Sequence, residues 1–295
     1  SAASAVYKRQ AKINLAFLSG PVRPDGYHNV ISIYQALDLF EKVSVESAND
    51  WEVELIGADL AEAERIPIDS SNLVIKAALE LAKHVGIEKP QPMRFVIEKH
   101  VPPAAGMAGG SADAAASLVA LNRAWGLDLS SAELTKVAAK IGADVPFALL
   151  GGTALGLDTG IVLHPLPPLG LQFVLLIFST PGLSTVDVFR EFDRLCPDGN
   201  LTKTPEQVMS QYESGLGRVL GDNSLEVAAY SLRPDLFGMA QMIPGKKAFV
   251  SGSGPTLFML SKDSQEVASW HRAFVANGFS AMVCKTSNGS AELVN

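Results

Sequence analysis

The chain has 295 residues, of which 47% are hydrophobic and 19% are charged, and its formal net charge is −7. This composition is typical of a globular protein and excludes disordered, collagen-like and coiled-coil chains. The acidic balance also excludes non-specific binding to nucleic acid or to an anionic membrane, because such binding requires a basic surface. The two cysteines, Cys196 and Cys284, are too few for a disulfide framework, so we expect a reducing, cytoplasmic environment.

Alternating apolar residues and turn chemistry divide the N-terminal third into short elements. The sequence Arg23-Pro-Asp-Gly26 is typical of a turn, because proline and glycine set the backbone angles that a turn requires. Apolar residues at helical spacing predict a helix over 72–85, and Gly86 is a suitable residue to end it. Strands are predicted over 12–18, 31–39, 42–46 and 93–99.

A glycine-rich segment follows the last of these strands. Residues 102–112 are small or apolar and lead into an alanine-rich helix predicted over 113–125. Such a loop favours phosphate binding, because glycine lets the backbone approach an anion and a helix N-terminus presents unpaired N–H groups. Ser111 would either cap the helix or donate its hydroxyl to a phosphate oxygen. The segment matches neither the Walker loop nor the dinucleotide-binding pattern, and a plain strand-to-helix turn remains the alternative.

The second half of the chain differs in character from the first. The stretch 159–186 contains no Asp, Glu, Lys or Arg, but prolines interrupt it. A membrane span needs about 20 consecutive apolar residues, so we expect a buried strand over 171–178 instead. A helix is predicted over 185–195, and the residues that follow it, up to about 243, show no clear pattern. Further helices are predicted over 131–141 and 265–276, and further strands over 248–251, 256–260 and 281–285. These elements predict an α+β protein of two domains, residues 1–160 and 161–295.

Three segments together resemble the motifs of the kinase superfamily named for galactose, homoserine, mevalonate and phosphomevalonate. They are Ala11-Lys-Ile-Asn-Leu15, the glycine-rich segment, and Ser251-Gly-Ser-Gly-Pro-Thr256. Within that superfamily, Arg23-Pro-Asp-Gly-Tyr-His28 and Gly142-Ala-Asp-Val-Pro-Phe147 are similar to segments of one family, the 4-diphosphocytidyl-2-C-methyl-D-erythritol kinases. The Asp-Gly-Tyr-His element is the specific part, and the resemblance runs from about residue 11 to residue 260.

The resemblance implies an ATP-dependent kinase that phosphorylates the 2-hydroxyl of 4-diphosphocytidyl-2-C-methyl-D-erythritol, in the non-mevalonate route to isoprenoids. It implies that Asp144 is the catalytic acid–base residue and that Lys12 is its cationic partner. These residue types suit phosphoryl transfer, in which positioning and charge stabilisation dominate. The two side chains must then meet within about 3 Å or slightly more. The alternatives are that Asp144 caps a short helix and that Lys12 is a solvated strand residue.

The same resemblance implies the binding residues. Tyr27 would stack on cytosine and His28 would hydrogen bond to the base edge, while Asn14 would contact the methylerythritol hydroxyls. Thr185 and Phe189 would close over the cytidine, sharing one helix face. Each of these has an alternative: Phe189 would be a core residue, His28 would be a turn residue with a satisfied hydrogen bond, and residues 251–256 would form a simple hairpin. The residues expected around ATP are Asn72, Pro102, Pro103, Ala104, Ala105, Gly106, Met107, Ala108, Gly109, Gly110, Ser111 and Ala112.

The chain departs from the family pattern at two positions, since many members carry Ser at the position of Ala112 and Asn at that of Asp113. Asp113 would either help to hold Mg²⁺ or stabilise the first helical turn, and we favour the helical role. The sequence identifies no metal ligands, so Mg²⁺ is expected to arrive with ATP.

The fold that the resemblance implies has an N-terminal domain like domain 2 of ribosomal protein S5 and a ferredoxin-like C-terminal domain. The active site would lie in the cleft between them. We expect a monomer or weak homodimer without nucleic-acid or membrane partners. Two other functions stay open: a superfamily kinase for another alcohol such as homoserine or mevalonate, and a nucleotide-binding regulator without catalysis.

Overall fold

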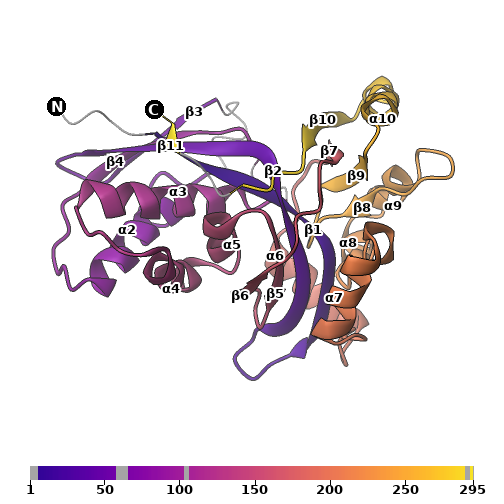
Figure 1. Cartoon of the computed structure of the whole chain (residues 1–295), viewed down its shortest axis with the longest axis horizontal. Helices are drawn as coiled ribbons and strands as arrows, with labels where there is room; N and C mark the ends of the chain where they lie inside the picture. The colour runs from indigo at the N-terminus through magenta and orange to yellow at the C-terminus, as the bar shows by residue number, and fades with distance from the viewer. Residues whose placement is uncertain (1–5, 58–65, 103–105, 290–292, 295) are drawn as a thin grey trace.

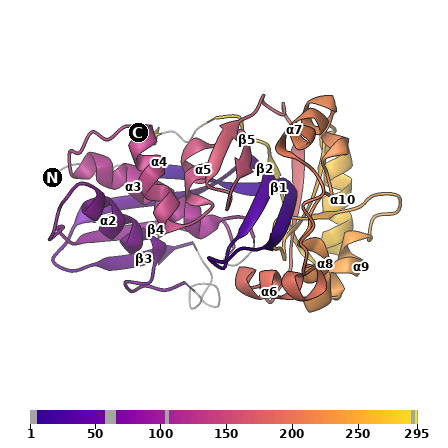
Figure 2. The same ribbon diagram turned by 90° about the horizontal axis from the view of Figure 1, so that it is seen from below.

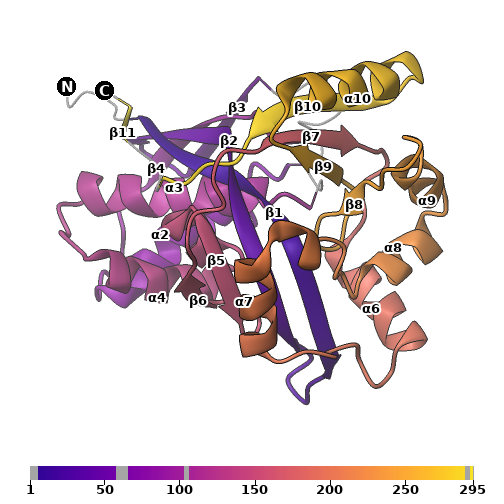
Figure 3. The same ribbon diagram turned by 45° about the vertical axis from the view of Figure 1, so that its right-hand side comes forward.

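A long hairpin organises the larger of two β-sheets. The computed structural model describes residues 6–57, 66–102, 106–289 and 293–294. Strands β1 (Val6–Val22) and β2 (His28–Ser47) pair antiparallel, and Figure 3 shows the length of this hairpin. The other strands of this sheet are β3 (Glu52–Ile56), β4 (Met93–Glu98), β5 (Thr153–Leu157), β6 (Val162–Pro165) and β11 (Leu293–Val294). The order is β11-β1-β2-β4-β3, with β5 beside β2 and β6 beside β5.

Four helices cover one face of this sheet (Figure 1). They are α2 (Leu73–His84), α3 (Gly109–Ala124), α4 (Ser131–Ile141) and α5 (Val145–Leu150). Their apolar sides form one core with alternate residues of the strands. This core includes Phe95 and Ile97 of β4, Leu118 of α3 and Val137 of α4. The bounds of α4 agree with the prediction, because a capping box between Ser130 and Glu133 marks its start in the sequence.

A second, four-stranded antiparallel sheet contains the charge-free stretch. Its strands are β7 (Phe173–Phe178), β8 (Phe249–Val250), β9 (Leu257–Ser261) and β10 (Ser280–Lys285), in the order β10-β7-β9-β8. The helices of this part are α6 (Thr185–Leu195), α7 (Pro205–Ser214), η1 (Leu216–Arg218), α8 (Glu226–Leu232), α9 (Asp235–Ala240) and α10 (Ser264–Ala276). The two groups of helices lie at opposite ends of the molecule (Figure 2). Within the described residues, no helix has both the length and the apolarity to cross a membrane.

The hairpin joins the two sheets through a shared core. Ile13 and Leu15 of β1 and Ile33 of β2 belong to one apolar cluster with Leu176 of β7 and Phe258 of β9. The structure therefore has the mixed helix and strand content of an α+β protein, with β1 and β2 central to both parts.

Several predicted bounds of helices and strands were wrong. The strands expected over 31–39 and 42–46 are one strand, β2, and α3 begins at Gly109 rather than at residue 113. The poorly patterned region contains α7, α8 and α9, which are only six to ten residues long. Residue 160, the expected domain boundary, lies in the turn of the β5–β6 hairpin, and both strands of that hairpin belong to the larger sheet.

Candidate active site

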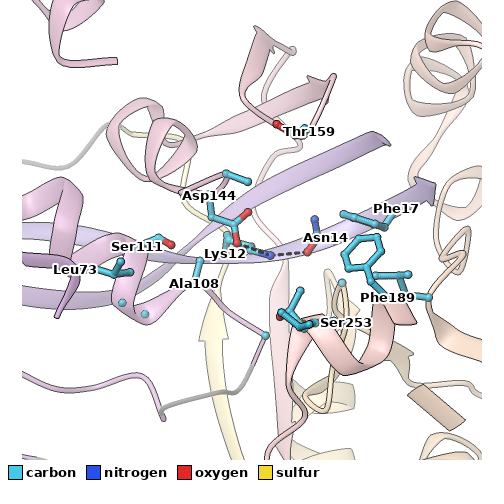
Figure 4. Close-up of a pocket in the computed structure, with 18 of the residues that line it drawn as sticks. Lys12, Asn14, Phe17, Leu73, Ala108, Ser111, Asp144, Thr159, Phe189 and Ser253 are labelled. Carbon is cyan, nitrogen blue, oxygen red and sulfur yellow. Dashed lines mark hydrogen bonds and ion pairs between the residues drawn. The ribbon is translucent and has the colours of Figure 1, made fainter. Parts of the chain in front are cut away.

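A cleft of about 820 Å³ collects side chains from distant parts of the chain. Figure 4 shows its centre, with the N-terminus of α3 on one side of Lys12 and a pair of phenylalanines on the other. Met107 and Ala112 are buried beneath the glycine segment and do not line the cleft, and residues 103–105 lie outside the described residues. Of the residues predicted for the site, the cleft is lined by Lys12, Asn14, Tyr27, His28, Asn72, Pro102, Gly106, Ala108, Gly109, Gly110, Ser111, Asp144, Thr185 and Phe189.

Lys12 and Asp144 meet at the centre of the cleft. The Nζ atom of Lys12 lies 3.5 Å from Oδ2 of Asp144, and the lysine side chain is 7% exposed against 30% for the carboxylate. Asp144 directly precedes α5, but its side chain makes no capping hydrogen bond. The alternative of a plain helix cap is therefore not what the structure shows, and the carboxylate faces the cleft. Lys12 lies on β1, deep enough that it is not a solvated strand residue.

A chain of hydrogen bonds fixes the orientation of Asn14. Lys12 Nζ donates to Asn14 Oδ1 at 2.7 Å, and Asn14 Nδ2 donates to Ser32 Oγ at 2.8 Å. Ser32 in turn donates to the carbonyl of Ala16 at 2.9 Å. Because each polar atom has a defined partner, this network holds the ammonium beside Asp144. Ser32, on β2, was not predicted from the sequence.

The two glycine turns pack against each other beside this network. At Gly106, where φ is +72°, a Cβ atom would lie 2.7 Å from the carbonyl oxygen of Gly254. At Gly252, where φ is +56°, a Cβ atom would lie 2.8 Å from Asn14 Oδ1. Both positions therefore require glycine, for their backbone angle and for space. The 251–256 turn is thus part of the cleft wall, and Ser251 Oγ accepts from the backbone N–H of Asn14.

The N-terminus of α3 opens into the cleft without a side-chain cap. Ala108 is the cap residue, with a left-handed φ of 60°, and it makes no side-chain hydrogen bond. The first intrahelical bond runs from Ala112 N to Ala108 O, so helix geometry leaves the N–H groups of Gly109, Gly110 and Ser111 without partners inside the helix. Ser111 lies within the first turn and does not cap the helix, contrary to one of the two predicted roles. This arrangement suits an anion.

His28 lies against α6 at the other end of the cleft. Its Nδ1 is 3.0 Å from the carbonyl of Gly20, its Nε2 is 3.6 Å from Asp193 Oδ1, and its ring stacks on Phe189 with centroids 4.6 Å apart. Phe189 also contacts Phe17 edge-on. It lines the cleft and is partly buried against an apolar cluster that includes Val188 and Phe192. Asp193 was not predicted, although its spacing of four residues from Phe189 on a helix could have indicated it.

The remaining residues of this end are polar or exposed. Thr185 Oγ1 and Ser253 Oγ are 3.1 Å apart and link α6 to the second glycine turn. Tyr27 is 61% exposed at the mouth of the cleft, where its ring is open to a ligand.

Asn72 and Asp113 have structural partners. The Asn72 side chain caps α2, accepting from Val74 N at 3.0 Å, and it also donates to the carbonyl of Pro67. Asp113 is buried and pairs with Lys99 at 2.9 Å. Because α3 begins at Gly109, Asp113 lies beyond the first helical turn in which it was predicted, and Lys99 holds its carboxylate. The described residues contain no group of three or more His, Cys, Asp or Glu placed to hold a metal ion.

Comparison with known proteins shows the family of the chain. Residues 72–152 match the family described as GHMP kinases N terminal domain. A 4-diphosphocytidyl-2-C-methyl-D-erythritol kinase of Nocardioides sp. is 42% identical over 259 residues, covering 85% of this chain and 86% of the relative. One of Nocardia farcinica is 41% identical over 288 residues, covering 95% and 92%. The chain belongs to the 4-diphosphocytidyl-2-C-methyl-D-erythritol kinase family.

Solved structures of related kinases have the same fold as this chain. A crystal structure of 4-(cytidine 5'-diphospho)-2C-methyl-D-erythritol kinase superimposes with a TM-score of 0.72 at 27% identity, over 96% of this chain and all of the other. A mevalonate kinase superimposes with a TM-score of 0.68 at 12% identity and shares the fold alone. The predicted membership of the 4-diphosphocytidyl-2-C-methyl-D-erythritol kinase family is therefore confirmed, and the alternative of a superfamily kinase for another alcohol is not supported.

Proposed function

We propose that the protein transfers the γ-phosphoryl group of ATP to the 2-hydroxyl of 4-diphosphocytidyl-2-C-methyl-D-erythritol. The observation that carries this proposal is the position of the Lys12–Asp144 pair. It lies between an uncapped helix N-terminus, which suits a triphosphate, and the His28–Phe189 stack, which suits a base. Nucleotide binding alone does not require a buried lysine beside a carboxylate that faces the cleft, so this pair favours a kinase over a regulator.

In the proposed reaction, Asp144 orients the 2-hydroxyl and accepts its proton as the new O–P bond forms and the bond from the γ-phosphorus to the ADP oxygen breaks. Phosphoryl transfer has a loose transition state, so late proton transfer needs little basicity. Lys12 stabilises the charge on the phosphoryl oxygens. Asn14, whose Oδ1 holds the lysine, is proposed to contact the methylerythritol part.

The glycine segment and α3 are proposed to bind the phosphates of ATP, with Asn72 lining the adenine end while it caps α2. Mg²⁺ is proposed to arrive with ATP and to keep several water ligands, since oxygen atoms of triphosphate are its usual partners. Its role is to neutralise charge between the phosphates. The backbone N–H groups of Gly109, Gly110 and Ser111 would supply the remaining positive field.

The cytidine is proposed to lie between Tyr27 and Phe189, with the polar edge of the base toward His28. The 3.6 Å gap from His28 Nε2 to Asp193 is longer than a hydrogen bond, so this nitrogen is free to engage a base. Thr185 would close the site through its contact with Ser253.

We also propose the domain division that the resemblance implies. An S5-like part would contain the larger sheet and α2–α5, and a ferredoxin-like part would contain the smaller sheet, with the cleft between them. Because the β5–β6 hairpin belongs to the larger sheet, the boundary would fall after Pro165. A monomer or weak homodimer, without nucleic-acid or membrane partners, is the proposed state.

The test is ADP release with ATP, Mg²⁺ and the cytidylyl substrate for the wild type and for Asp144→Asn. We expect wild-type turnover of about 1–100 s⁻¹ and a loss of about 10²–10⁴-fold in the variant. Asp50→Asn, which makes the same change at an exposed position outside the cleft lining, should retain full activity. Undiminished turnover in Asp144→Asn would remove the general-base role, and faster turnover of homoserine or mevalonate would overturn the substrate.

A further inference from the structure

Three charged side chains are enclosed beneath the N-terminus of α3. The Nζ atom of Lys99 lies 2.8 Å from Glu41 Oε1 and 2.9 Å from Asp113 Oδ2. Each of the three side chains is at most 6% exposed. One ammonium therefore serves two carboxyl groups, from β2 and α3, in an environment where an unpaired charge is costly. The catalytic pair described above does not use this group.

The two carboxyl groups are not equally satisfied. Glu41 also accepts the backbone N–H groups of His100 at 3.2 Å and Val101 at 3.0 Å. Asp113 has no such donors, and its Oδ1 is buried without a hydrogen-bond partner among the described residues. Hydrogen bonds to a carboxylate favour its charged form. Asp113 is therefore the member of the pair better suited to hold a proton.

The charged groups around Asp113 come from β1, β2 and the segment after β4. Arg9 of β1, the cross-strand neighbour of Glu41, donates to the carbonyl of Lys8 and forms no ion pair with either carboxyl group in the described part of the chain. The buried face of α2, which also packs on α3, is apolar. Burial raises the pKa of Asp113 to about 7, against the lowering effect of Lys99 and with the raising effect of Glu41.

Asp113 and Lys99 line the same cleft as Gly109 and Ser111. Asp113 lies four residues after the first residue of α3. A triphosphate bound at the N–H groups of the first turn would add negative charge beside Asp113, and like charge disfavours its carboxylate.

We infer that Asp113 takes up one proton from solvent when the triphosphate of ATP binds at the N-terminus of α3. The carboxylate becomes a carboxylic acid, and a single Lys99–Glu41 ion pair then remains beneath the phosphates. Asp113 thus couples nucleotide binding to pH. The inference rests on the proposed nucleotide site.

The test is calorimetric titration of ATP with excess Mg²⁺, without acceptor substrate, at pH 7.5 in buffers of different ionisation enthalpy. The dependence of the binding heat on the buffer gives the number of protons taken up. For the wild type we expect about 0.5–1 proton per nucleotide more than for Asp113→Asn, which keeps the shape of the neutral acid but cannot titrate. Asp50→Asn, an exposed carboxyl outside the cleft lining, should match the wild type.

Equal proton numbers for the wild type and Asp113→Asn would overturn the inference while leaving nucleotide binding intact. If that variant does not fold, the wild type alone still decides. Its dissociation constant for ATP should rise between pH 7 and 8.5, by at most about tenfold per unit, and a flat profile would overturn the inference. Absence of any ATP binding by folded wild type would overturn the proposed nucleotide site and the inference with it.

Discussion

At the centre of the cleft, one lysine is shared between an amide and a carboxylate. Lys12 donates to Asn14 Oδ1 at 2.7 Å and lies 3.5 Å from Asp144, so the shorter contact is to the neutral group. The amide therefore holds the ammonium in place, and the more exposed carboxylate stays open to the cleft. This arrangement suits the acid–base role proposed for Asp144.

Tyr27 provides a prediction at this scale. Its ring is 61% exposed at the cleft mouth, so Tyr27→Ala removes little packing and should leave stability nearly unchanged. Loss of base stacking is worth about 1–3 kcal/mol, which corresponds to a rise in KM for the cytidylyl substrate of about 5- to 150-fold. Steady-state kinetics would measure it, with KM for ATP unchanged. The control is Phe237→Ala, an aromatic ring 55% exposed outside the cleft lining. An unaltered KM for the substrate in Tyr27→Ala would exclude stacking.

At the scale of elements, two glycine turns far apart in sequence shape one wall of the cleft. The turn before α3 and the turn between β8 and β9 approach so closely that a methyl group at Gly106 would lie 2.7 Å from a carbonyl oxygen of the other turn. The geometry of the α3 N-terminus therefore depends on a segment that belongs to the smaller sheet.

A matched pair of substitutions separates this close approach from backbone strain. Gly86 and Gly106 have similar backbone angles, φ +76° and +72°, but a Cβ atom at Gly86 would meet nothing within 4 Å. Gly86→Ala should cost only the strain of the left-handed conformation, about 1–2 kcal/mol. Gly106→Ala should cost more and should also weaken ATP binding at least several-fold, because the turn must move away from Gly254. Denaturant unfolding and ATP titration would measure the two effects. Equal losses of stability with unchanged ATP affinity would show that the turns can separate freely.

At the scale of the whole molecule, the buried charges under α3 link stability to pH. The pKa of Asp113 is raised from 3.8 to about 7 in the folded protein, chiefly by burial. A carboxyl with a raised folded pKa contributes stability that is fully present below its unfolded pKa, near 4, and is lost as the pH rises through about 7. Titration of Asp113 therefore weakens the fold as the pH rises from about 4 to about 7.

Asp113→Asn should remove this dependence. Between pH 4 and 7 the unfolding free energy of the wild type should fall relative to that of Asp113→Asn. The fall should be at most about 1.4 kcal/mol per pH unit. Urea unfolding at several pH values would measure it. Asp50→Asn, exposed to solvent, should follow the wild type. A constant difference between wild type and Asp113→Asn would mean that Asp113 stays ionised throughout.

The sequence by itself determined the family, the mixed helix and strand content and most of the regular elements, because those depend on motifs, periodicity and capping signals within short segments. It also predicted that Lys12 and Asp144 would meet. It did not predict β3, β5 and β6, which are short, nor the helices between residues 205 and 240, which have weak periodicity. Ser32 was missed for another reason, because only its contact with Asn14 in the folded chain marks it.

The tertiary structure alone decided the roles of Asp113 and Gly106. The sequence places Asp113 in a first helical turn, where a solvated acid is ordinary, whereas the fold buries it against Lys99 and Glu41 from two other segments. It likewise brings Gly254 against Gly106. Burial and long-range contact decide the energy of a charge or a methyl group, and both depend on segments that lie far apart in the sequence.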